Sequence, residues 1–223
     1  MAKKRYAKAL PTVQAAIDIL GANRVIMPEE LKYIYGENFN PKSATIRNSE
    51  QQLIEAGEEN GRMEVKSDWR FIPANGFSFP EMIGIFGVGN DLPFFNPKSL
   101  WLLNPNQIKW KWTLRHPVPG YRLIDFSGRF PNHSWQKMND KIKALGTDYK
   151  RADEAIFTEA ALTIFKATGT MVAKDWYHWS NAVGSGQGYV CVGASDSPGW
   201  LVIGYLRGGS GLGLRVAVAR KFV

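Results

Sequence analysis

The stretch that decides the fold is residues 175–222, DWYHWSNAVGSGQGYVCVGASDSPGWLVIGYLRGGSGLGLRVAVARKF. Three aromatic residues crowd its start, and residues 214–222 alternate apolar with small or basic residues, which predicts a half-buried strand. Between these ends, residues 184–213 are rich in Gly, Ser, Val, Ala and Leu and hold two strand-like runs, 189–192 and 200–205. Short strands and loops on a fixed frame commonly carry binding surfaces. We therefore expect a ligand-binding face in this segment.

The composition bounds the class of protein. The chain has 223 residues, of which 44% are hydrophobic and 13% aromatic, so it can fill the core of one large domain or two small ones. No run approaches the ~18 apolar residues of a membrane helix, and no apolar run of secretory type follows the basic start. We expect no membrane insertion and a cytoplasmic or virion-associated protein. One cysteine excludes an internal disulfide.

The first 75 residues have the pattern of a small helical module. We expect helices over residues 10–20 and 28–36, a third helix from a Ser43 cap to about Ala56, and a strand or hairpin arm over residues 62–72. This outline is also that of a winged-helix domain, so a winged-helix nucleic-acid-binding protein with an accessory β-rich domain is one alternative. The net charge of +8 is spread along the chain, and the third helix carries Glu50, Glu55, Glu58 and Glu59. Because these acids repel phosphates, the sequence disfavours nucleic acid as a partner.

The remainder of the chain predicts an α+β domain. Residues 73–119 show no helical period, and residues 108–114 alternate as a strand does. After them come a strand at 121–126, two helices at about 135–145 and 152–168, and several short strands. This order predicts helices packed on a largely antiparallel sheet, with a domain boundary near residues 73–76.

Four segments carry a resemblance to a known family: GYRL at 120–123, HWSNA at 178–182, GYVCVGASDSPG at 188–199 and VAVARKF at 216–222. In this order they resemble the C-type lectin fold and, within it, the variable proteins of diversity-generating retroelements. The likeness covers about residues 110–223. It implies a C-type-lectin-like domain over 76–223 behind the helical module of 1–75, with a variable region at about 184–213 before a fixed last strand.

The resemblance also implies a function. In these systems substitutions are directed to adenines, commonly in AAC codons, which leaves Trp, Gln, Lys, Glu and Met unreachable. Every residue of 188–213 except Trp200 is reachable from AAC, although a Gly-rich segment lacks those residues for other reasons as well. We expect a non-enzymatic protein that displays a diversified surface to a protein or other macromolecular ligand. The expected contact residues are Tyr189, Cys191, Ser195, Asp196, Trp200, Tyr205, Arg207 and Ser210, and the expected scaffold residues are Trp176, Trp179, Arg220 and Phe222.

The patterns of known catalytic and metal sites are missing from the sequence. Pro131 and Asn132 follow Phe130 rather than an acid, so the lectin calcium motif is not formed. The three histidines have no zinc-like spacing. The same fold hosts formylglycine-generating enzymes, which use a cysteine pair, and here Cys191 stands alone. An enzyme of that type is the second alternative; we expect no catalytic residue, metal or cofactor.

Overall fold

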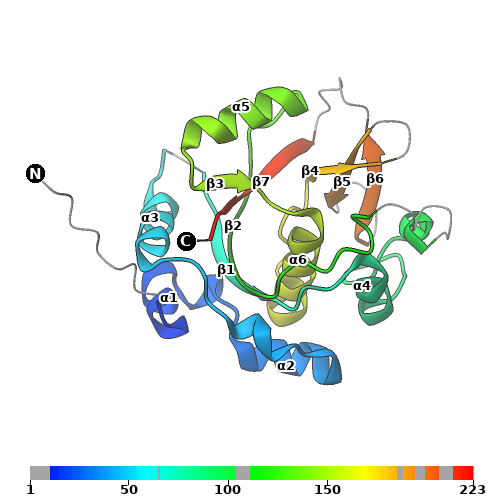
Figure 1. Ribbon diagram of the computed structural model, residues 1–223, viewed down its shortest axis with the longest axis horizontal. Coiled ribbons are helices and arrows are strands. Elements are labelled where there is room, and N and C mark those ends of the chain that lie inside the picture. The colour runs from blue at the N-terminus through cyan, green and yellow to red at the C-terminus, as the bar shows by residue number, and fades with distance from the viewer. Residues whose placement is uncertain are drawn as a thin grey trace, which may run out of the picture.

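The computed structural model describes residues 11–64, 66–103, 111–184, 188–193, 199–205 and 213–222. Within these ranges the protein is an α+β fold of six α-helices and a seven-stranded mixed sheet, which confirms the predicted class (Figure 1). The helices are α1 (Val13–Leu20), α2 (Pro28–Tyr35), α3 (Glu50–Gly61), α4 (Phe79–Phe86), α5 (Trp135–Leu145) and α6 (Glu154–Thr168). The strands are β1 (Trp69–Ala74), β2 (Gly120–Arg129), β3 (Tyr149–Arg151), β4 (Tyr177–Val183), β5 (Tyr189–Gly193), β6 (Leu201–Tyr205) and β7 (Leu214–Arg220).

The last strand lies at the centre of the sheet. The strand order is β1-β2-β7-β4-β5-β6, and β3 also pairs with β7. The neighbours are antiparallel except for β4 and β7, which run parallel with Tyr177 opposite Leu214. The C-terminal strand therefore connects the β1-β2 pair to the β4-β5-β6 half, where the predicted binding face lies.

The sheet is covered on both faces. Along β7, Val216 and Val218 point to one face and Ala217 and Ala219 to the other, as the alternation of a strand requires. The valines join a core with residues of α1, α3 and α5, whereas the alanines join a core with residues of α2, α4 and α6. The central strands are therefore held between two helical layers.

The helical module and the following domain share this sheet. Strand β1 pairs with β2 along its whole length, from Trp69 opposite Asp125 to Ala74 opposite Gly120. Both hydrophobic cores contain residues from either side of position 75. The boundary expected near residues 73–76 thus lies inside a continuous sheet and core, not in a linker.

The acids of α3 hold that helix on the sheet. Glu59 accepts hydrogen bonds from Trp69 Nε1 at 2.8 Å and from the Tyr149 hydroxyl at 3.2 Å, and it also pairs with Arg129. Glu55 lies 2.9 Å from the guanidinium of Arg220 on β7. Glu55 and Glu59, two of the four acidic residues of this helix, therefore have a structural role.

The predicted start of the third helix is wrong. Residues Pro41–Ala44 form a 3-10 turn, and α3 begins only after Ser49. Ser49 Oγ accepts from the Gln52 amide at 3.3 Å, and Gln52 Oε1 accepts from the Ser49 amide at 3.2 Å. Ser43 has no such reciprocal partner in a capping box, so the second serine begins the helix.

The expectation of no helix within residues 73–119 is also wrong, because α4 lies there. It begins at a capping box in which Glu81 accepts from the Ser78 amide at 2.8 Å, and it ends at Gly87. Its buried residues are Phe79, Met82, Ile83 and Phe86, a helical spacing that the surrounding Gly, Pro and aromatic residues obscure. In the predicted strand at 108–114, residues 111–114 form a turn and residues 108–110 lie outside the described ranges.

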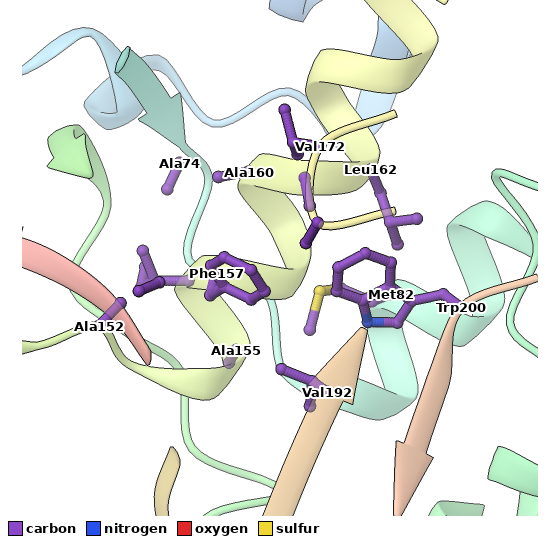
Figure 2. Close-up of a cluster of buried hydrophobic side chains, with 14 of the residues drawn as sticks. Ala74, Met82, Ala152, Ala155, Phe157, Ala160, Leu162, Val172, Val192 and Trp200 are labelled. Atoms are coloured by element: carbon purple, nitrogen blue, oxygen red, sulfur yellow. The ribbon is translucent and has the colours of Figure 1, made fainter. Parts of the chain in front are cut away.

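The core beside α6 positions the second half of the sheet. Phe157 on α6 packs near Trp200, with 5.9 Å between ring centroids, and near Trp176 at 5.6 Å. Figure 2 shows the Trp200 indole close to Met82 and Val192, which belong to the same core. The helix predicted from residue 152 starts at Glu154 and ends at Gly169, as its terminal glycine indicated. Strands β4–β6 thus share one buried hydrophobic core with α6.

Candidate functional site

Two of the predicted contact residues lie directly opposite each other. Strand β5 pairs with β6 in a register that runs from Tyr189 opposite Tyr205 to Gly193 opposite Leu201. Both tyrosines are half-buried and share one face of the sheet with Cys191, whereas Val190 packs into the opposite core. The structure therefore brings Tyr189 and Tyr205 together on a partly open face.

Two tryptophans support these tyrosines, and we call the four residues Trp135, Trp179, Tyr189 and Tyr205 the aromatic face. Tyr189 stacks on Trp135 with 4.2 Å between centroids and 4° between planes. Tyr205 meets Trp179 edge-on at 5.8 Å and 77°. The Trp135 Nε1 donates to the Ser180 carbonyl at 2.9 Å, which fixes its ring against β4. Trp135 is not among the contact or scaffold residues expected from the sequence; its one local signal is its place directly after the Ser134 cap of α5.

A buried arginine lies beneath the aromatic face. Arg151 is only 5% exposed, and its guanidinium lies 5.0 Å from the Trp135 ring centroid. It donates to the Trp179 carbonyl and, at 2.9 Å, to Asn139 Oδ1. Burial lowers its pKa to about 9. No carboxylate among the described residues forms an ion pair with this arginine. Arg151 thus ties β3, α5 and β4 together and leaves a positive charge under the face.

A cavity of about 720 Å³ opens beside the aromatic face, and we call it the basic cavity. Val183, which lines it, is the register partner of Tyr189, and Arg151 both lines it and approaches Trp135. The lining residues are Lys111, Trp112, Arg115, Lys150, Arg151, Asp153, Glu154, Asn181, Ala182 and Val183. The cavity and the aromatic face therefore adjoin each other at the end of β4.

The charges of the basic cavity are unequal. Arg115 pairs with both acids, with Asp153 and, at 3.0 Å, with Glu154. Burial and the neighbouring Asp153 raise the pKa of Glu154, which weakens the negative charge near neutral pH. Burial and then the nearby Arg122 lower the pKa of Lys150. Four basic side chains among the described lining residues nevertheless face two acids, so positive charge is in excess in the cavity.

Two predicted contact residues need correction. Cys191 is fully buried, and burial raises the pKa of its thiol, because its side chain points into the core under α5. Trp200 is 1% exposed, and its Nε1 donates to Thr158 Oγ1 at 3.2 Å within the α6 core (Figure 2). Neither side chain offers surface to a ligand. The remaining predicted contacts lie outside the described residues: Ser195, Asp196, Arg207 and Ser210.

The four residues predicted as scaffold are buried or half-buried. Trp176 and Trp179 belong to the two cores. Arg220 pairs with Glu55 and lies 3.9 Å over the Tyr149 ring. Phe222 is half-buried, with the Arg122 guanidinium 4.4 Å from its ring centroid. All four thus have structural contacts, and Trp179 supports Tyr205 from the buried side of the aromatic face.

His178 has a structural environment. Its Nδ1 accepts from the Ala217 amide at 3.0 Å, so its Nε2–H donates to the Ala152 carbonyl, also at 3.0 Å. Burial and the charge of Arg151 lower its pKa to about 3, so the ring is neutral. Across the described ranges, no group of three or more His, Cys, Asp and Glu side chains is arranged to hold a metal ion. No helix of those ranges combines the length and apolarity that a membrane crossing requires.

Comparison of the chain with protein-family models, with curated proteins and with solved structures finds no match.

Proposed function

We propose that this chain is a non-enzymatic ligand-binding protein that displays a diversified surface on a C-type-lectin-like scaffold, as the variable proteins of diversity-generating retroelements do. The observation that carries the proposal is the pair Tyr189 and Tyr205. They lie opposite each other and half-exposed, on strands whose opposite face is buried against α6. Exchangeable side chains on a rigid sheet are what such a function requires.

The order of elements supports the scaffold part of the proposal. Strand β2 is followed by the helices α5 and α6, with the short β3 between them, and then by four further strands. The last of these, β7, returns to pair with β2. This is the strand, helix, helix and short-strand order on which the resemblance to C-type lectins rests.

The local energetics favour tolerance to substitution. The ladder of β5 depends on backbone hydrogen bonds to β4 and β6, which any residue except proline can make. The supporting rings of Trp135 and Trp179 come from α5 and β4, outside the predicted variable region. Exposed tyrosines add contact area at low entropic cost, as in antibody loops. Residues 189 and 205 can therefore change while their platform stays.

Two observations weigh against the alternative functions. Because Glu55 and Glu59 bind Arg220 and Arg129, one side of α3 faces the sheet and is not free to meet nucleic acid. Cys191 is buried and its thiol pKa is raised, which is opposite to the exposed, low-pKa thiol that a catalytic cysteine needs.

The proposal is tested first by sequencing independent isolates of the gene. We expect substitutions to concentrate in residues 184–213, including Tyr189 and Tyr205, with Trp135 and Trp179 unchanged. A near-copy of the terminal coding repeat should lie beside a reverse transcriptase gene. An even spread of substitutions over the chain would overturn the proposal.

A laboratory test uses two matched libraries. In one, codons 189 and 205 are replaced by NNC, and in the other codons 135 and 179 are replaced in the same way. We expect most members of the first library to remain soluble and cooperatively folded, and few members of the second. Equal losses in both libraries would contradict the division into exchangeable and supporting residues.

A further inference from the structure

The described lining residues of the basic cavity lie outside the predicted variable region of the sequence. Among the residues that the structure describes, its lining comes from 111–115, 150–154 and 181–183, and none of these described residues falls within the predicted variable region 184–213. Substitutions in that region would leave the lining side chains in place. This described part of the lining would therefore be the same in every variant of the protein.

The charges of the cavity favour an anion. Its lining includes Lys111, Arg115, Lys150 and Arg151, against Asp153 and Glu154. Arg115 forms ion pairs with both Asp153 and Glu154. Lys111, Lys150 and Arg151 form no ion pair within the part of the chain that the structure describes. Cations gathered in a partly enclosed hollow repel one another, and a bound anion relieves that repulsion.

The walls add an apolar surface beside these charges. Trp112 is half-buried, its Nε1 donates to the Val183 carbonyl at 3.2 Å, and its ring meets Phe79 edge-on at 5.5 Å. These contacts hold the indole in one orientation. Val183 is 41% exposed and extends the apolar wall. The volume of about 720 Å³ falls within the usual range for small-molecule sites.

We propose that the basic cavity is a fixed second binding site for a phosphate-bearing small molecule with a flat ring, of the nucleoside monophosphate class. The ammonium groups of Lys111 and Lys150, which come from two separate segments, meet the phosphate dianion. The guanidinium of Arg115 is already occupied by Asp153 and Glu154 and orders that wall. The ring of the ligand packs against Trp112 and Val183.

Isothermal titration calorimetry at low ionic strength tests this proposal, with AMP, pyrophosphate, adenosine and citrate as probes. We expect saturable binding of AMP that weakens as salt is added. The double variant Lys111→Gln/Lys150→Gln should lose at least tenfold in AMP affinity. Trp112→Leu should weaken AMP severalfold and leave pyrophosphate unchanged, because only AMP carries a ring. Lys143→Gln, an exposed lysine of α5 outside the lining, is the matched control and should bind as the parent does.

Thermal unfolding of each variant establishes that it is folded before titration. Absence of saturable AMP and pyrophosphate binding at millimolar concentration would overturn the proposal, as would equal losses in the Lys143 control. Citrate binding as tight as that of AMP would overturn the phosphate class. The proposal does not rest on diversification, since variants at Tyr189 and Tyr205 should bind AMP normally. Its failure would leave the sequencing test of the diversified face unaffected.

Discussion

The ring of Tyr189 lies flat on the indole of Trp135, with 4.2 Å between the centroids and 4° between the planes. The tyrosine belongs to β5, within the predicted variable region, and the tryptophan begins α5, outside it. Under the proposed function, the stack is a contact between an exchangeable residue and a fixed platform. How strongly the two are coupled decides how freely position 189 can change.

A double-mutant cycle measures that coupling. We expect Tyr189→Ala and Trp135→Ala to show an interaction energy of about 0.5–1.5 kcal/mol in urea unfolding, the range for aromatic pairs. Tyr33→Ala, at a residue that is 92% exposed, is the control and should be additive with Trp135→Ala. Additivity of the Tyr189 pair would mean that the stack contributes nothing to stability.

The second prediction separates the exchangeable tyrosine from its support at position 205. Tyr205→Ser should lower the free energy of unfolding by less than about 1 kcal/mol, because the ring is half-exposed. Trp179→Ala should lower it by about 3–5 kcal/mol, because the side chain is fully buried and leaves a cavity. Chemical denaturation of both variants gives the comparison. A larger effect at position 205 than at 179 would contradict a tolerant binding face.

The third prediction concerns the docking of α3. Glu59→Gln should destabilise the protein by about 2–3 kcal/mol, since it weakens the ion pair with Arg129, a largely buried side chain. The neighbouring Glu58→Gln is the matched control. Its carboxylate is exposed and lies 3.9 Å from Arg62, so we expect a change of less than about 0.5 kcal/mol. Similar effects of the two changes would show that α3 does not depend on this contact.

The fourth prediction concerns pH. The Glu159 carboxylate accepts hydrogen bonds from three consecutive amides: Asn75, Gly76 at 3.1 Å and Phe77 at 3.3 Å. Burial raises its pKa to about 7 despite these bonds. Between about pH 4.3, the ordinary value for glutamate, and pH 7 the folded chain binds more protons at this site than the unfolded chain does. This contribution to stability is complete below that window and is lost as pH rises through it.

Glu159→Gln removes this titration. The unfolding free energy of the variant minus that of the parent should rise with pH across the window, by about 1.4 kcal/mol per pH unit at most and about 3.7 kcal/mol in total. Urea unfolding at several pH values measures the difference. A constant difference would mean that the three amides keep the carboxylate ionised throughout, contrary to the raised pKa.

The fifth prediction uses the single cysteine. Because Cys191 is buried and its thiol pKa is raised, Ellman's reagent should not react with the native protein at neutral pH. One thiol per chain should react once urea unfolds it. Rapid reaction in the native state would restore Cys191 as a possible contact residue and reopen the enzymatic alternative.

Local signals predicted much of the secondary structure. The helix from Ser134 to Gly146 and the end of α6 at Gly169 follow from caps that act within one turn. The run that became β7 follows from side-chain alternation, and the runs that became β5 and β6 follow from their short apolar, strand-like composition. The start of α3 failed because Ser43 and Ser49 are both competent caps, and the side chain of Gln52 decided between them.

The candidate site was only partly predictable. Tyr189 and Tyr205 were expected as contacts from residue type and position, and the sheet register places them opposite each other. Burial of Cys191 and Trp200 depends on which side of the strand faces a core, and short apolar runs do not indicate that. The basic cavity draws on three separate segments, and no spacing along the chain relates them.

The sequence by itself determined where α5 and α6 end, that the runs of β5, β6 and β7 are strands and that the fold is α+β, because these signals act between near neighbours. Tertiary structure alone decided that β7 lies at the centre of the sheet and that α3 binds it through Glu55. It also decided that Trp135 supports Tyr189. These relationships join residues far apart in the chain, and they arise only when burial of both sheet faces fixes the register and the packing of the helices.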